Sequence, residues 1–127
     1  MLANDPIYAS LPAADLERAK RFYAEKLGLT PESELPGGVL YRCGRDTRFS
    51  VFPSQGVASG TYTQAIWLVE DVESEVAALK ARGVVFEEYD LPSLKTVNSI
   101  ATIGPNKGAF FKDSEGNLLS LVQFDQA

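Results

Sequence analysis

An internal repeat constrains the fold of this chain more than any other feature of its sequence. In residues 8–28, polar and apolar residues first alternate as they do in a β-strand. A turn follows, and then apolar residues recur with the spacing of an α-helix. Residues 64–83 repeat that plan 56 positions later. Residues 38–52 match residues 108–122 at a displacement of 70, so the second copy contains an insertion of 14 residues. Self-similarity of this kind fixes an architecture before secondary-structure propensities are weighed.

Each copy predicts a βαβββ module, which makes the fold class α+β. Asp15 and Asp71 are good N-caps for the two helices, and Gly28 supplies a left-handed C-cap for the first. Two such modules are expected to form a curved mixed sheet around a cleft, with the helices on the other side. The chain is therefore expected to be a single domain over 1–127, with a first module over 6–53, a linker over 54–61 and a second module over 62–124.

Alternation and turn residues place the expected strands. Residues 89–100 lack clear periodicity, and an irregular stretch of that length inside a compact domain is usually functional or mobile. The expected strands are 7–11, ended by Pro12, then 29–35, 39–43 and 48–53 in the first copy, and 63–69, 84–87, 109–112 and 118–124 in the second.

Composition excludes several classes of partner. The chain has 127 residues and a net charge of −5, whereas binding to nucleic acid requires a basic face. No apolar run reaches the ~20 residues of a membrane span, so no membrane partner is expected. The single cysteine, Cys43, fits a reducing cytoplasm. The absence of histidine removes both the commonest metal ligand and the commonest general base.

Four polar residues mark the candidate site. Tyr8 and Gln64 are the same position in the two copies, and so are Ser50 and Ser120. They interrupt strongly apolar strands, and polar side chains that face a concavity are typical of a ligand site. Solvation or a local hydrogen bond explains any one of them equally well, but the set related by the repeat favours a site. The apolar residues expected on the helix side are Ile7, Leu11, Phe49, Val51, Trp67, Leu119 and Leu121.

Three further residues complete the candidate set. Ser10 shares a strand face with Tyr8, Phe52 offers a stacking surface, and Lys95 stands on the inserted loop. No residue is assigned a catalytic role. The expected ligand-binding residues are Tyr8, Ser10, Ser50, Phe52, Gln64, Lys95 and Ser120.

Two motifs resemble the vicinal oxygen chelate superfamily, which includes glyoxalase I, bleomycin-resistance proteins, fosfomycin-resistance enzymes and extradiol dioxygenases. Residues 15–28 (DLERAKRFYAEKLG) carry the first motif and residues 110–123 (FFKDSEGNLLSLVQ) the second. The resemblance covers 6–124 and implies the paired-module fold and a homodimer, with a cleft closed within one chain or across two. One scaffold hosts many chemistries, so the resemblance implies no single activity.

In metal-dependent relatives, His, Gln or Glu side chains on facing strands hold a divalent ion. The resemblance puts those positions on Tyr8, Gln64 and Ser120, with Ser50 as the first-module counterpart of Ser120. Only Gln64 is an ordinary ligand of the family, and the set offers neither an anion nor an imidazole. No metal and no cofactor are therefore expected.

Three functions remain open from the sequence. The first is a metal-free binding protein of the bleomycin-resistance type that sequesters a small organic molecule, for which the acidic balance suggests a cationic guest. The second is a glyoxalase-like lyase or isomerase, or a dioxygenase-related enzyme, with an atypical site on Gln64 or on Tyr8 and Lys95. The third is a structural or regulatory partner domain.

Overall fold

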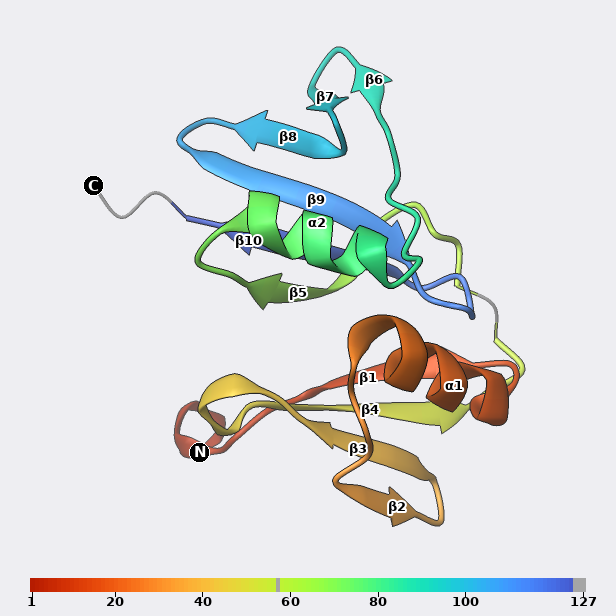
Figure 1. Cartoon of the computed structure of the whole chain (residues 1–127). Coiled ribbons are helices and arrows are strands. Elements are labelled where there is room, and N and C mark those ends of the chain that lie inside the picture. Colours follow the sequence, from red (N-terminus) through yellow and green to blue (C-terminus); the bar gives the residue numbers. More distant parts are fainter. Residues whose placement is uncertain (57, 125–127) are drawn as a thin grey trace.

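The computed structural model describes residues 1–56 and 58–124, which form two α-helices and two β-sheets (Figure 1). One position of the predicted linker, residue 57, lies outside the described residues. In chain order the elements are the 3₁₀ turn η1 (Leu2–Asn4), β1 (Ala9–Ala13), α1 (Leu16–Leu27), β2 (Ser33–Leu35), β3 (Gly38–Arg42), the 3₁₀ turn η2 (Gly44–Asp46), β4 (Arg48–Pro53), β5 (Thr63–Leu68), α2 (Val72–Ala81), β6 (Asp90–Leu91), β7 (Leu94–Val97), β8 (Ile100–Ile103), β9 (Asn106–Lys112) and β10 (Leu118–Gln123).

Four strands of each sheet follow the same order, and the mixture of helices and mixed sheets confirms the α+β fold class. Sheet A has the strand order β1-β4-β3-β2, and sheet B has the order β5-β10-β9-β8-β7-β6. In each sheet the strand before the helix pairs in parallel with the last strand, as β1 does with β4 and β5 does with β10. In Figure 1, α1 lies over β1 and β4, while α2 lies across β9 and β10. That 6–53 and 62–124 are separate modules stays a prediction.

The helix caps predicted from the repeat are confirmed. The Asp15 carboxylate accepts a hydrogen bond from the backbone N–H of Arg18 at 3.1 Å, and the Asp71 carboxylate accepts two from the first turn of α2 at 3.1 and 3.3 Å. Gly28 ends α1 with φ 70° and donates its N–H to the carbonyl of Tyr23. These caps satisfy backbone groups that a helix end leaves without partners, and so fix where each helix begins or ends.

The first strand differs from the prediction at both ends. Ile7 was expected on the helix side, but it precedes β1 and is 93% exposed. Pro12 was expected to end the strand, yet it lies within β1 opposite Phe52. Strand β1 is an edge strand of sheet A, and proline is tolerated in edge strands because the side of the backbone that faces away from the sheet needs no N–H donor.

The second copy also differs from the prediction after its helix. Residues 84–87 form no strand and make only the isolated bridge between Phe86 and Phe111. Residues 89–100 contain β6 and β7, which extend sheet B. The Glu88 carboxylate orders this insertion, because it accepts bonds from Ser99 Oγ and Thr96 Oγ1, both at 2.7 Å. These bonds lower the pKa of Glu88, the Ser99 bond most strongly.

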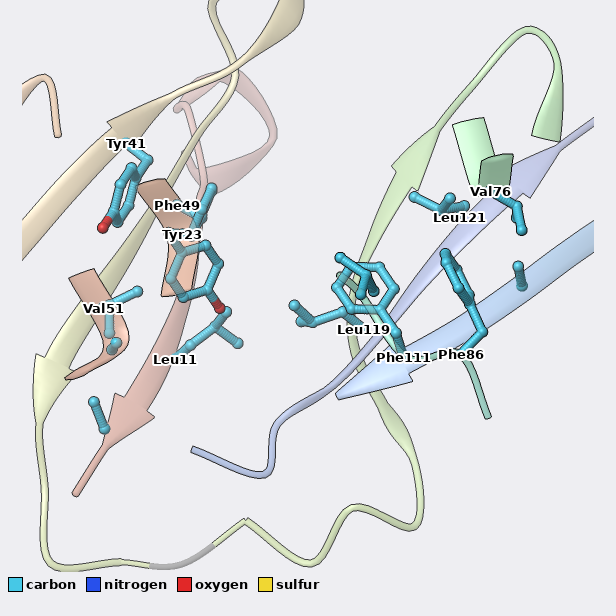
Figure 2. Close-up of a cluster of buried hydrophobic side chains, with 14 of the residues drawn as sticks. Leu11, Tyr23, Tyr41, Phe49, Val51, Val76, Phe86, Phe111, Leu119 and Leu121 are labelled. Atoms are coloured by element: carbon cyan, nitrogen blue, oxygen red, sulfur yellow. The ribbon is translucent and has the colours of Figure 1, made fainter. Parts of the chain in front are cut away.

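The helix-covered faces of the two sheets share one core. Figure 2 shows Leu11 and Leu119, from sheets A and B, pointing toward each other. The ring of Phe49 meets Trp67 edge to face at 5.6 Å, which joins β4 to β5. Trp67 is thus on the helix side, as predicted. The other faces of the two sheets therefore point away from this core. The buried residues of the core are Leu11, Ala13, Ala19, Tyr23, Val39, Tyr41, Phe49, Val51, Val72, Val76, Val84, Phe86, Ala109, Phe111, Leu119 and Leu121.

A carboxylate from the turn between β9 and β10 ties sheet B to α1. Glu115 binds the Arg18 guanidinium in two places, at 2.8 and 2.9 Å, and accepts the backbone N–H of Asp15 at 2.9 Å. The Glu115 side chain is 1% exposed, whereas that of Arg18 is 48% exposed. The Arg18 guanidinium holds the pKa of Glu115 at about 2, below its ordinary value of 4.5.

This low pKa predicts how stability depends on pH. The folded state binds the Glu115 proton more weakly than the unfolded state, so the contribution is present above pH 4.5 and lost as the pH falls toward 2. We expect Glu115→Gln to lower the free energy of unfolding at pH 7 by about 2 kcal/mol. That is less than the pKa difference alone implies, because solvent screens the exposed side of the pair. Urea unfolding between pH 7 and pH 2.5 measures it.

The variant should lose less stability than wild type over this pH range. Glu25→Gln, which changes an exposed carboxylate on α1, is the control and should follow the wild-type profile. Parallel profiles for wild type and Glu115→Gln would contradict the prediction.

Candidate functional site

The outer face of sheet A carries a hollow of about 330 Å³. We call it the sheet A hollow. Because Ser10 is in register with Ser50, and Pro12 with Phe52, these positions lie on the face opposite the buried Leu11 and Val51. The residues that line it are Tyr8, Ser10, Leu35, Gly37, Gly38, Val39, Ser50 and Phe52.

A pair of hydroxyls provides the polar part of this lining. Ser10 Oγ and Ser50 Oγ share a hydrogen bond of 2.7 Å across the parallel strands β1 and β4. Each hydroxyl has one proton and two lone pairs, so the pair retains one proton and several lone pairs for a bound molecule. Tyr8, 52% exposed, adds a third hydroxyl and an aromatic ring just before β1.

A close approach of two strands shapes one wall of the sheet A hollow. Gly38 has φ 138°, and a Cβ atom placed on it would lie 2.3 Å from the carbonyl oxygen of Val51. Only glycine tolerates both the backbone angle and this distance. Gly37, by contrast, has no atom within 4 Å of a built Cβ. The wall beside Phe52 is therefore formed by bare backbone at Gly38.

The structure brings together four of the seven predicted site residues and leaves three elsewhere. Tyr8, Ser10, Ser50 and Phe52 line the sheet A hollow, whereas Gln64 and Ser120 lie on sheet B and Lys95 on β7. The Lys95 side chain is 70% exposed, with its ammonium 3.9 Å from Asp90. Sequence reasoning did not include Leu35, Gly37, Gly38 and Val39 in the site, although the Pro-Gly-Gly turn was visible.

The outer face of sheet B is mainly apolar where it meets solvent. Ser120 is 2% exposed and lies in register between Ile66 of β5 and Phe110 of β9. Its hydroxyl has one weak contact, 3.5 Å to the carbonyl of Leu121. Next to it, Ile66 is 56% exposed and Leu68 is 71% exposed. Gln64 lies at a break in the register of β5, between Thr63, which pairs with Leu118, and Ala65, which pairs with Leu119, and its side chain is half-buried.

The donor set does not fit the divalent ion that some members of the superfamily hold. Tyr8 and Ser50 lie in the sheet A hollow, while Gln64 and Ser120 lie on the other sheet. All four are neutral donors, and hard divalent cations prefer carboxylate oxygens. Within residues 1–56 and 58–124, no group of three His, Cys, Asp or Glu side chains is placed to hold a metal ion.

Among the described residues, no helix is both long enough and apolar enough to cross a membrane. The helices are α1 (Leu16–Leu27) and α2 (Val72–Ala81).

Solved structures share this fold along nearly the whole chain. TnmS3, an antibiotic binding protein from Streptomyces sp. CB03234, is 25% identical, with a TM-score of 0.67 and coverage of 98% of this chain and 99% of that one. A glyoxalase family protein from Enterococcus faecalis is 23% identical, with a TM-score of 0.70 and coverage of 96% and 99%. The fosfomycin resistance protein FosX from Listeria monocytogenes is 14% identical, with a TM-score of 0.71 and coverage of 97% and 95%.

No curated protein matches the sequence significantly. A family model matches residues 7–121, which include both helices and every strand except the last two residues of β10. The duplicated topology, the two capped helices and this match agree with the resemblance carried by the two sequence motifs. The chain belongs to the Glyoxalase/Bleomycin resistance protein/Dioxygenase superfamily.

Proposed function

We propose that this chain is a binding protein that sequesters a small, uncharged, amphipathic organic molecule in the sheet A hollow without a metal ion. The observation that carries the proposal is the chemistry of the lining, which combines two aromatic rings, three hydroxyls and no charged side chain among the described residues. The volume of about 330 Å³ is at the lower end of the range for small-molecule sites. The likeness to an antibiotic binding protein supports this class of function.

The lining favours a neutral guest over the cationic one that the acidic composition suggested. No carboxylate lines the sheet A hollow, so a bound cation would lose its hydration without gaining an ion pair there. Tyr8 and Phe52 offer aromatic surface, and the Ser10–Ser50 pair offers hydrogen bonds to a carbonyl or hydroxyl group. A planar molecule with one such group satisfies both parts.

We propose also that the chain acts as a homodimer in which sheet B of a second copy covers the sheet A hollow. The hollow is lined by sheet A and its connections alone, while the outer face of sheet B exposes Ile66 and Leu68. Adjacent exposed apolar side chains of this kind often mark an interface.

Thermal unfolding with a panel of neutral bicyclic and tricyclic aromatic ketones, and amines of equal size, tests the proposal. Ketones should raise the Tm, because a ligand that binds only the native state stabilises it. Ser50→Ala and Tyr8→Ala should each weaken binding about 2- to 10-fold, the range for one hydrogen bond or one aromatic contact. Sedimentation of the complex should give two chains.

Ser93→Ala, in the exposed turn between β6 and β7, is the matched control and should bind as wild type does. Three results would contradict the proposal: no compound raising the Tm, both site variants binding with unchanged affinity, or a complex that sediments as one chain.

A further inference from the structure

A second cavity, of about 250 Å³, lies on the opposite side of the fold from the sheet A hollow, where the end of α1 meets α2 over sheet B. We call it the junction cavity. No residue is shared between the two linings. The junction cavity is lined by Leu27, Leu29, Trp67, Val69, Glu75, Leu79, Phe111 and Leu121.

The walls of the junction cavity are held in place by contacts between the two copies of the repeat. The Arg82 guanidinium donates to the carbonyls of Lys26 at 3.2 Å and Ala24 at 3.3 Å, which fixes the last turn of α1 against the end of α2. Trp67 is held by the Phe49 ring. The position of the junction cavity is therefore set by contacts between helices and strands, and not by a loop.

Glu75 is the single charged residue of this lining. It is exposed on α2, one helical turn before Leu79, so both side chains lie on the same face of the helix. Glu73, two residues earlier, is paired with Lys107 at 3.1 Å, whereas Glu75 has no ion pair with any described residue. The carboxylate of Glu75 is thus available at the edge of an otherwise apolar cavity.

We propose that the junction cavity is a second binding site that takes a small lipophilic ammonium ion. Its hydrocarbon part occupies the apolar space beside Trp67 and Phe111, and its ammonium group pairs with Glu75. A volume below the usual range for drug-sized ligands limits the guest to a fragment of about ten non-hydrogen atoms. This site goes beyond the proposed function, because it differs from the sheet A hollow in place and in preferred charge.

The chain has one tryptophan, which makes the test specific to this site. Trp67 lines the junction cavity and does not border the sheet A hollow. Titration with 2-cyclohexylethylammonium should change Trp67 emission to saturation, and the neutral 2-cyclohexylethanol should bind more weakly. Neither probe absorbs where tryptophan is excited.

Matched variants distinguish binding in the junction cavity from non-specific quenching of Trp67 and from binding in the sheet A hollow. Glu75→Gln should weaken binding of the ammonium about three- to fivefold, as expected for a partly exposed ion pair, and leave the alcohol unchanged. Glu73→Gln and Tyr8→Ala should leave both titrations as in wild type. Leu79→Phe should block both probes by filling the cavity. An equal response to ammonium and alcohol, an unsaturable response, or loss of binding in Tyr8→Ala would overturn the proposal, whatever the ketone panel shows.

Discussion

Replacing Asp113 with alanine is expected to lower the free energy of unfolding by about 3–5 kcal/mol, because several buried donors lose one charged acceptor and each unsatisfied donor costs about 1–3 kcal/mol. Asp113 is 6% exposed and follows β9. Its carboxylate accepts the Tyr23 hydroxyl at 2.6 Å and the Asn117 amide Nδ2 at 2.8 Å, and also the backbone N–H groups of Glu115 and Asn117. Alanine leaves these donors without that acceptor, and a buried donor without a partner is strongly destabilising.

Urea unfolding at a fixed protein concentration measures this effect. Burial, and to a lesser degree the Asp113 carboxylate, raises the pKa of Tyr23 well above its ordinary value, so the phenol remains a donor. Tyr23→Phe removes that single bond and should cost about 1–2 kcal/mol. Asp90→Ala changes an exposed carboxylate whose ion-pair partner, Lys95, is 3.9 Å away, and it should cost under about 1 kcal/mol. A loss for Asp113→Ala no larger than that for Asp90→Ala would refute the role given to this carboxylate.

Gly38→Ala should destabilise the fold by about 3 kcal/mol and abolish binding in the sheet A hollow. The new Cβ would lie 2.3 Å from the Val51 carbonyl oxygen and 2.9 Å from the Phe52 Cα, both of them backbone atoms. Strand β4 must therefore move, and the positive φ of residue 38 adds strain of its own. Movement of β4 displaces Ser50 and Phe52 together.

Gly37→Ala is the neighbouring control, because nothing lies within 4 Å of its built Cβ. It should change stability by less than about 0.5 kcal/mol. Urea unfolding and the ketone thermal shifts measure both variants. Equal stability and equal binding in the two glycine variants would show that β3 and β4 do not need this close approach.

The sequence predicted the fold because the repeat contains its own local signals. Asp15 and Asp71 cap equivalent helices, and period-two alternation placed Ser10 and Ser50 on the same strand faces. Capping and alternation depend on residues that are near in sequence. The paired strands β1 and β4 then brought those predicted positions into one hollow.

The orientation of sheet B relative to sheet A was not predictable from such local signals. Alternation placed Gln64 and Ser120 on a face of sheet B, but it cannot say which way that face turns relative to sheet A. That orientation depends on contacts between distant residues, such as Phe49 with Trp67 and Tyr23 with Asp113. Similarly, β6 and β7 of the insertion are too short for a periodic pattern, and their order depends on bonds to Glu88.

The strand order of sheet B has a consequence for synthesis on the ribosome. Strand β10 lies between β5 and β9, although it comes last in sequence among the strands of the described residues. Until β10 emerges, β5 has no neighbour in its sheet and β9 exposes one unpaired edge, and such edges invite pairing with other chains. All strands of sheet A precede β10 in the sequence, so sheet A is complete by then. The apolar face of sheet A that α1 covers can therefore pack against the incoming strands of sheet B. The nascent second half thus remains vulnerable to aggregation until its final strand is translated.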